Sequence, residues 1–249
     1  MKRKPEALIE SRQNPKFKTW LSLLDSKGLK RQGQALVSGE KLVQELLRDR
    51  PEMVRDILLP PKATRPNTTR PNITRLSGPL FNLLDVLGTK SPLAVIQTPA
   101  IPDWEPEPPR GLELVVALGD PANLGALLRS AEAFGVTRVI LTREAASPFL
   151  PKALKASALS SLRVKLARTA KSLAELELEN AFGLDMDGES LTEFTWPEDM
   201  YLVLGEEGQG LPGGLEIKRL SVPMAGKVES LNATIAASLA LYSRFISAR

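Results

Sequence analysis

From Gly111 onward, short apolar runs with the composition of strands alternate with helical segments, and this alternation constrains the fold more than any other feature. Strands that are joined by helical crossovers pair in parallel and form a sheet that helices cover on both faces. The first expected strand covers residues 112–118 and the last covers 220–222, before a helix at 233–247. We therefore predict an α/β domain with a mostly parallel sheet over residues 111–249.

The residues before this domain differ from it in charge. Residues 1–98 hold 18 Lys and Arg against 9 Asp and Glu, whereas residues 99–249 hold 15 against 20. An excess of positive charge favours a polyanion such as nucleic acid as the partner of the first part. A solvated surface rich in lysine would give the same excess, so charge alone leaves both interpretations open.

The pattern of residues 1–98 predicts a small α/β module of short helices and strands. Within it, residues 62–75 are rich in Thr, Pro and Arg, and we expect them to form an exposed loop on the basic face. Five prolines in residues 99–110 then indicate a stiff linker. The expected domains are therefore residues 1–98 and residues 111–249.

Several classes of chemistry are excluded by residue types that the sequence lacks. It contains neither Cys nor His, which excludes disulfides, Ser–His–Asp triads and zinc sites built on Cys and His. No window approaches the roughly eighteen uncharged apolar residues of a membrane span, and the first residues contain no apolar signal-peptide core. We expect a cytoplasmic protein that binds no membrane and no metal, and whose chemistry uses Asp, Glu, Lys, Arg, Ser, Asn or backbone groups.

Three expected strands of residues 111–249 lead into glycine-containing turns with polar side chains. Ligand sites of α/β proteins form beyond the carboxyl ends of the strands, so turns of this kind can contribute to one site. Three such turns in one domain are explained more simply by a shared site than by chance. The stretches read DPANLGALLRSAEAFG from Asp120, LGEEGQGLP from Leu204, and VPMAGKVESLNATIA from Val222.

Each stretch also has an ordinary structural interpretation when it is taken singly. Asn123 fits the N-cap of a helix, and Arg129 fits a surface arginine that pairs with Glu132 three residues on. The stretch from Leu204 matches neither a Walker loop nor the dinucleotide fingerprint, and its carboxylates argue against binding phosphate. Ser230 or Asn232 fits the N-cap of the last helix.

Taken together, the three stretches resemble the three motifs of the SpoU (TrmH-type) branch of the SPOUT RNA methyltransferases, in order and in spacing. The likeness covers residues 111–249, and residues 12–16 with 35–40 are similar to the RNA substrate-binding domain of many members, which has a ribosomal-protein-like α/β fold. The resemblance implies a C-terminal segment threaded as a trefoil knot, a homodimer, S-adenosylmethionine as cofactor, and methyl transfer to a ribose 2′-hydroxyl of RNA.

The resemblance also implies roles for particular residues. Those implied in catalysis are Arg129, Asn123, Glu207, Ser230 and Asn232. Those implied in cofactor binding are Leu204, Gly205, Gly210, Val222, Met224, Leu231 and Asn232. The chain departs from the family pattern at Glu206, where Ser or Asn is usual, at Ala233-Thr234, which replaces a common Val-Ser, and after Ala156-Ser157-Ala158, where a glycine often follows. These departures leave the substrate open.

Without histidine, Arg129 is the side chain that the resemblance makes central to catalysis. An arginine with a pKa above about 12 does not act as a literal base. We therefore expect Arg129 to bind the adjacent phosphate and to stabilise the developing alkoxide, while that phosphate or water takes the proton. Asn123 and Glu207 would orient Arg129 and the ribose, and Ser230 with Asn232 would shape the cofactor loop.

Two further points concern partners. A face of small residues on the last helix allows close packing, either across a homodimer or within the domain; it consists of Ala233, Ala236, Ala237 and Ala240. The substrate-binding module favours ribosomal RNA over tRNA. Three alternatives stay open: a tRNA 2′-O-methyltransferase, a catalytically inactive RNA-binding factor of ribosome assembly, and a doubly wound enzyme that acts on a small molecule.

Overall fold

The computed structural model describes residues 6–68, 71–226 and 228–247. By its internal contacts the chain divides into a first unit, residues 1–100 with 147–159, and a second unit, residues 101–146 with 160–249. The inserted segment of the first unit contains helix α6 (Pro151–Ala156), which has contacts with strand β2 of that unit. We expected this segment to belong to the domain of residues 111–249, and the division by contacts differs from that expectation. The expected domain boundaries stay a prediction.

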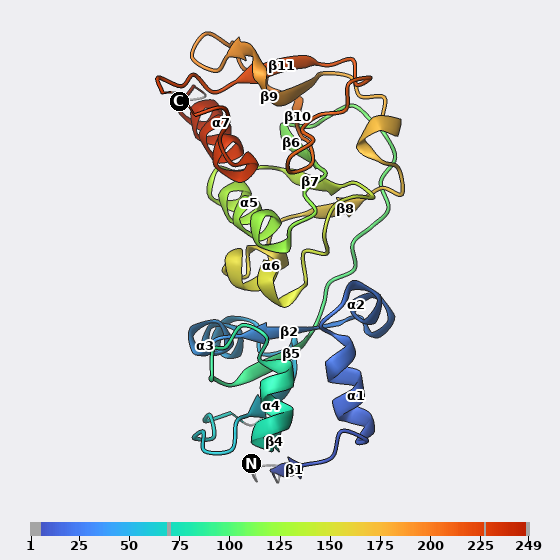
Figure 1. Cartoon of the computed structure of the whole chain (residues 1–249), viewed down its shortest axis with the longest axis vertical. Helices are drawn as coiled ribbons and strands as arrows, with labels where there is room; N and C mark the ends of the chain where they lie inside the picture. Colours follow the sequence, from blue (N-terminus) through green and yellow to red (C-terminus); the bar gives the residue numbers. More distant parts are fainter. Residues whose placement is uncertain (1–5, 69–70, 227, 248–249) are drawn as a thin grey trace. The chain divides into compact units, whose positions relative to one another are not determined.

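A five-stranded mixed sheet forms the centre of the first unit, in the order β1-β4-β3-β5-β2 (Figure 1). β4 pairs in parallel with β1 and β3, and β5 pairs antiparallel with β3 and β2. The strands are β1 (Ala7–Ile9), β2 (Gln34–Ser38), β3 (Val54–Leu59), β4 (Asn72–Leu76) and β5 (Leu93–Gln97). The helices besides α6 are α1 (Pro15–Ser22), α2 (Ser26–Gln32), α3 (Glu40–Asp49) and α4 (Gly78–Leu84).

The end of the expected exposed loop at residues 62–75 is a strand instead, because β4 begins at Asn72. Arg75 binds the backbone of residues 60–63, which precede the strand: its Nη1 donates to the carbonyl oxygens of Pro60, Pro61 and Ala63 at 2.8, 2.9 and 3.1 Å. Arg75 also pairs with Glu6. Arg70, which belongs to the same expected loop, lies outside the described residues. Arg75 is therefore a structural residue, whereas the sequence pattern indicated a solvent-facing one.

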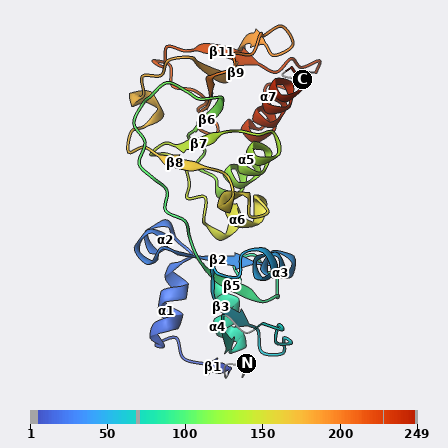
Figure 2. The same cartoon turned by 180° about the vertical axis from the view of Figure 1, so that it is seen from behind.

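Six parallel strands form the sheet of the second unit, in the order β11-β9-β10-β6-β7-β8 (Figures 1 and 2). This confirms the predicted α/β fold with a parallel sheet. The strands are β6 (Leu112–Val116), β7 (Arg138–Leu141), β8 (Leu166–Arg168), β9 (Ala181–Ser190), β10 (Met200–Leu204) and β11 (Lys218–Ser221). The helices are α5 (Pro121–Ala133) and α7 (Ala233–Ser247), with short 3-10 turns η1 (Ser160–Leu162) and η2 (Leu173–Glu175).

The order of the strands creates a switch point between β6 and β10. From β6 the chain moves outward to β7 and β8, and it then returns to the other side of β6 to form β9, β10 and β11. β6 and β10 are neighbours, and their last residues, Val116 and Leu204, lie opposite each other. In parallel sheets, ligands bind beyond the carboxyl ends of the strands at such a point. The segments that follow Val116 and Leu204 are two of the three polar turns.

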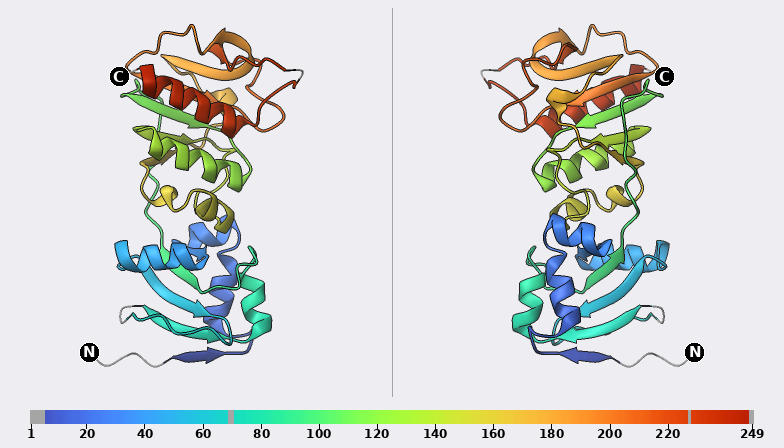
Figure 3. Two further views of the ribbon diagram at one scale, coloured as in Figure 1. Left: turned by 90° about the vertical axis from the view of Figure 1, so that its left-hand side faces the viewer. Right: turned by 90° about the vertical axis from the view of Figure 1, so that its right-hand side faces the viewer.

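Two apolar layers enclose the central strand β6. Leu114 and Val116 face a cluster that includes α5 and α7, and these two helices pack side by side on that face (Figure 3). Val115 and Ala117 face the opposite cluster, where Trp104 and Tyr201 meet edge to face with ring centroids 5.9 Å apart. Alternate residues of β6 are buried on opposite faces, as expected for a strand of a covered parallel sheet.

Part of the expected proline-rich linker, residues 99–110, packs against the second unit. Trp104 is only 4% exposed, and its backbone N–H donates to the carbonyl oxygen of Arg168 at 2.7 Å. The buried hydroxyl of Tyr201 donates to the carbonyl oxygen of Glu107 at 2.7 Å. Burial raises the pKa of Tyr201 to about 12, so this hydroxyl stays a hydrogen-bond donor at neutral pH.

Helix α7 buries half of the small-residue face that we considered for a dimer. Ala237 and Ala240 are fully buried in the cluster that contains α5, whereas Ala233 and Ala236 are only partly buried. The exposed face carries large apolar side chains instead: Ile235, Leu239, Tyr242 and Ile246, all between 43% and 53% exposed. Buried Ala237 and Ala240 support packing of the alanine face within the domain, and the homodimer stays a prediction. No helix within the described ranges is long and apolar enough to span a membrane.

Candidate cofactor cavity and active site

The turn after β10 folds into a tight loop. Glu206 and Gly210 pair through two backbone hydrogen bonds of 3.1 and 2.9 Å, which close the loop at its base. Gly205 precedes this closure and is fully packed: a Cβ there would overlap the carbonyl group of Gly210 and lie 2.6 Å from the amide nitrogen of Leu211. A side chain at position 205 is therefore incompatible with the closed loop.

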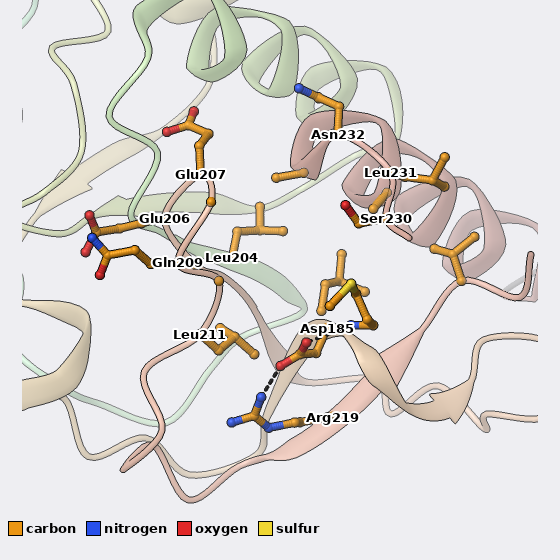
Figure 4. A pocket seen from close by; sticks show the side chains of 18 of the residues that line it. Asp185, Leu204, Glu206, Glu207, Gln209, Leu211, Arg219, Ser230, Leu231 and Asn232 are labelled. Carbon is orange, nitrogen blue, oxygen red and sulfur yellow. Dashed lines mark hydrogen bonds and ion pairs between the residues drawn. The ribbon is translucent and has the colours of Figure 1, made fainter. Parts of the chain in front are cut away.

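A cavity of about 530 Å³ lies between this loop, the middle of β9 (residues 184–186) and the stretch that leads into α7 (Figure 4). All seven residues that the sequence analysis associated with the cofactor line it: Leu204, Gly205, Gly210, Val222, Met224, Leu231 and Asn232. Glu207 and Ser230 line it as well, whereas Asn123 and Arg129 are not among its lining residues. The second and third polar stretches thus share one cavity.

Glu207 joins the first stretch to this cavity. Its carboxylate accepts hydrogen bonds from Asn123 Nδ2 at 3.2 Å and from the backbone N–H groups of Gly119 and Asp120 at 3.2 and 3.4 Å. Asn232 Nδ2 in turn donates to Asn123 Oδ1 at 3.4 Å. The chain Glu207–Asn123–Asn232 therefore connects the three stretches, although the three residues are far apart in sequence.

The helix caps explain why these amide side chains are available. Asp120, not Asn123, caps α5: its Oδ1 accepts from the N–H groups of Ala122 and Asn123 at 2.8 and 2.9 Å. The N-cap interpretation of Asn123 is thus wrong. Asn232 does cap α7, since its Oδ1 accepts from the N–H groups of Thr234 and Ile235 at 3.0 and 3.3 Å. Its Nδ2 stays free to reach Asn123.

Arg129 does not join this network. It is an exposed residue of α5, six residues beyond Asn123, which is roughly 9 Å along the helix axis. The expected pair with Glu132 is not formed, because Glu132 binds Arg163 at 2.6 Å and Ser160 at 2.5 Å. The hydrogen bond from Arg163 holds the pKa of Glu132 below its usual value. Within the described ranges Arg129 has no ion pair or hydrogen bond, so its guanidinium is available to a ligand.

Ser230 is exposed at the rim of the cavity, and its hydroxyl has no hydrogen-bond partner among the described residues. Lys227, which belongs to the same polar turn, lies outside those residues. No group of three or more Asp or Glu residues suited to a metal ion occurs in the described part of the chain.

Asp185 and Arg219 are cavity residues that the sequence analysis missed. They form an ion pair with each other, and both line the cavity (Figure 4). In the sequence Asp185 directly follows the short apolar run 181–184, which has the composition of a strand, so the rule that ligand sites form at strand ends could have found it. No comparable signal marks Arg219, because it lies inside a strand.

Comparisons with known proteins agree with this geometry. The sequence pattern of the SpoU rRNA methylase family matches residues 113–242. A 23S rRNA (guanosine(2553)-2′-O)-methyltransferase, RlmP of Bacillus subtilis, is 30% identical over 94% of this chain and 97% of its own length. A protein of Syntrophobacter fumaroxidans named ribosomal RNA small subunit methyltransferase G 2 is 40% identical over 98% of this chain. The chain spans only half the length of that relative.

A solved structure shares the fold of the chain. The SpoU methyltransferase AviRb of Streptomyces viridochromogenes, solved with the cofactor AdoMet, superposes with a TM-score of 0.73 and 24% identity. The match covers 94% of this chain and 98% of that protein, so it extends over both units.

Proposed function

The chain belongs to the SpoU rRNA methylase family, and on that premise we propose that it transfers a methyl group from S-adenosylmethionine to a ribose 2′-hydroxyl of ribosomal RNA. The observation that carries this proposal is the meeting of three polar stretches at one cavity, at the switch point of a parallel sheet. The relative from Bacillus subtilis, which the chain matches over nearly its whole length, is named for the same chemistry on 23S rRNA.

The cavity fits the cofactor in size and chemistry. Sites for small ligands have volumes of about 300–1,000 Å³ and combine apolar walls with a few polar groups. Leu204, Val222 and Leu231 supply apolar surface that suits the adenine ring, and the glycine-rich loop brings backbone groups to the cavity. Bound S-adenosylmethionine supplies an activated methyl group on a positively charged sulfur. The carboxylates of Glu206 and Glu207 at the cavity complement that charge.

The hydrogen-bonded chain Glu207–Asn123–Asn232 orients the reacting groups. Glu207 is held by two backbone N–H groups, so it fixes the amide of Asn123 in one orientation. Asn232 is fixed in the same way by its cap on α7. Ser230, whose hydroxyl at the rim has no partner in the described part of the chain, provides a polar contact for the ligand. Groups that are positioned before the substrate arrives lower the entropic part of the barrier.

Arg129 acts from the RNA side of the site. It lies outside the cavity and has no described partner, so its five N–H donors can bind a phosphate of the RNA backbone. Its positive charge stabilises the oxyanion that develops on the ribose oxygen, and the phosphate or water takes the proton. This role requires no deprotonation of the guanidinium.

The remaining expectations from the resemblance belong to this proposal. The segment that includes the third stretch is threaded as a trefoil knot, and residues 1–98 form the RNA-binding domain ahead of the methyltransferase domain at 111–249. A second copy of the chain covers the exposed apolar face of α7, formed by Ile235, Leu239, Tyr242 and Ile246. These residues recur every three to four positions, so they form one continuous stripe.

The test is transfer of labelled methyl from S-adenosylmethionine to separate pools of unmodified ribosomal RNA and tRNA. We expect label in ribosomal RNA, and none when Arg129→Ala replaces the wild type. Label in tRNA alone would establish the tRNA alternative. Assembled ribosomal subunits serve as a third substrate. Absence of label from all three substrates would contradict the enzymatic proposal and favour the alternative of an RNA-binding assembly factor.

A further inference from the structure

Strand β9 makes a detour at the cavity. Arg219 of β11 lies opposite Gly183 of β9, but the next residue of β11, Leu220, lies opposite Glu189. β9 therefore advances by six residues while β11 advances by one. Gly188 allows the strand to return, because a Cβ there would lie 2.5 Å from the carbonyl group of Arg219. Irregular strand pairing of this kind is frequent next to functional sites, where it redirects a side chain.

The side chain that the detour redirects is Asp185. Its Oδ1 accepts from the backbone N–H of Met186 at 2.7 Å, and its Oδ2 accepts from Nη1 of Arg219. Both carboxylate oxygens are thus engaged, and Arg219 is held at the cavity wall. The Nε and Nη2 groups of Arg219 donate to no residue in the described part of the chain. They form the fork with which arginine binds a carboxylate.

The pair is separated from the network around Glu207. Figure 4 shows Asp185 and Arg219 on one side of the cavity and Glu207 with Asn232 on the other. Among the described residues that line the cavity, Arg219 is the one cation, while Asp185, Glu206 and Glu207 carry the negative charges. For a ligand carboxylate that enters this cavity, Arg219 is therefore the oppositely charged side chain that the described lining provides.

We propose that Arg219 binds the α-carboxylate of the amino-acid part of S-adenosylmethionine, and that Asp185 positions Arg219 and attracts the α-ammonium group. This proposal rests on the proposed function. The adenosine part of the cofactor carries no formal charge, whereas the amino-acid part carries one charge of each sign. An aspartate–arginine pair at the cavity wall complements the charges of the amino-acid part and contributes no comparable binding free energy to the adenosine part.

The test compares two ligands that differ in the amino-acid part. S-adenosylhomocysteine contains it, and 5′-methylthioadenosine lacks it; neither carries the charged sulfur. We expect Arg219→Gln to weaken binding of S-adenosylhomocysteine roughly tenfold to a hundredfold by calorimetry, the range for a hydrogen bond to a charged group. The affinity for 5′-methylthioadenosine should stay within about twofold of wild type. Retained binding of this ligand also shows that the variant is folded.

Lys218→Gln is the matched control, because Lys218 is the preceding residue of β11, pairs with Glu189 and does not line the cavity. It should leave both affinities unchanged. Asp185→Asn should reduce selectivity for S-adenosylhomocysteine in the same direction as Arg219→Gln, and Asp187→Asn should not. Equal losses for both ligands in Arg219→Gln, or no loss for either, would overturn the proposal. A wild-type protein that binds neither ligand would contradict the cofactor assignment itself.

Discussion

Substituting Gly205 by alanine tests the architecture of the cavity with a single methyl group. A Cβ at this position would overlap the carbonyl group of Gly210, which belongs to the backbone and cannot rotate away. The loop must therefore open, and the two hydrogen bonds between Glu206 and Gly210 must lengthen or break. The change lies in the loop that supplies Gly205, Glu207 and Gly210 to the cavity, so cofactor binding should fail together with loop closure.

The expected magnitude follows from these contacts. Forcing a methyl group into a packed site costs about 1–3 kcal/mol, and each lost hydrogen bond about 1 kcal/mol. Gly205→Ala should thus lower the free energy of unfolding by roughly 3–5 kcal/mol, or shift the loop and weaken S-adenosylhomocysteine binding by a similar free energy. Urea unfolding measures the first effect, and calorimetry measures the second.

Gly213→Ala is the matched control, because a Cβ at Gly213 meets no atom within 4 Å and this residue does not line the cavity. It should leave the free energy of unfolding and the affinity close to wild type. If Gly205→Ala retained both wild-type stability and wild-type affinity, the closed loop would not be the structure in solution, and the reasoning would be refuted.

Three further predictions concern single side chains. Arg129→Lys keeps the positive charge but loses the planar fork of N–H donors, so the rate of methyl transfer should fall about tenfold or more while the affinity for S-adenosylhomocysteine stays unchanged. Near-native turnover would argue against the phosphate-binding role of Arg129. Leu239→Lys places a charge in the exposed stripe of α7, so light scattering should show the expected dimer for the wild type and a monomer for the variant. The same mass for both proteins would exclude this face as the interface. In the folded state Arg163 lowers the pKa of Glu132. The ionised Glu132 therefore stabilises the fold above its unfolded-state pKa, and this stabilisation is lost as the pH falls through its folded-state pKa. Glu132→Gln should therefore be less stable than wild type at pH 7 and nearly equal in acid, where the carboxylate is protonated; a pH-independent difference would disprove this linkage.

The parallel sheet and the meeting of the first two polar turns could be predicted from the sequence for one physical reason. Parallel strands place their carboxyl ends at the same edge of a sheet, so turns after neighbouring strands must lie close together. β6 and β10 are buried along their whole length and consist almost entirely of apolar residues, which makes such strands easy to recognise. The seven expected cofactor residues followed from the resemblance, and all of them line the cavity.

Several local features could not be predicted because they depend on tertiary contacts. Asp120 rather than Asn123 caps α5, since Pro121 already occupies the first helical position and Asp120 reaches the next two N–H groups. Helix α7 buries Ala237 and Ala240 in the cluster that contains α5 and exposes larger apolar residues, because the tertiary packing decides which of its apolar faces is covered. The Asp185–Arg219 pair depends on a register change between strands that are more than thirty residues apart.

The position of the methyl group in the product tests the central claim most directly. RNA that has received labelled methyl groups is digested with alkali, which cleaves at free 2′-hydroxyls and leaves a bond intact where the ribose oxygen is methylated. If the cavity serves 2′-O-methylation, the label appears in alkali-resistant dinucleotides, and Arg129→Ala removes it. Label in alkali-labile mononucleotides would show that the methyl group lies on a base, and it would contradict the account of the active site.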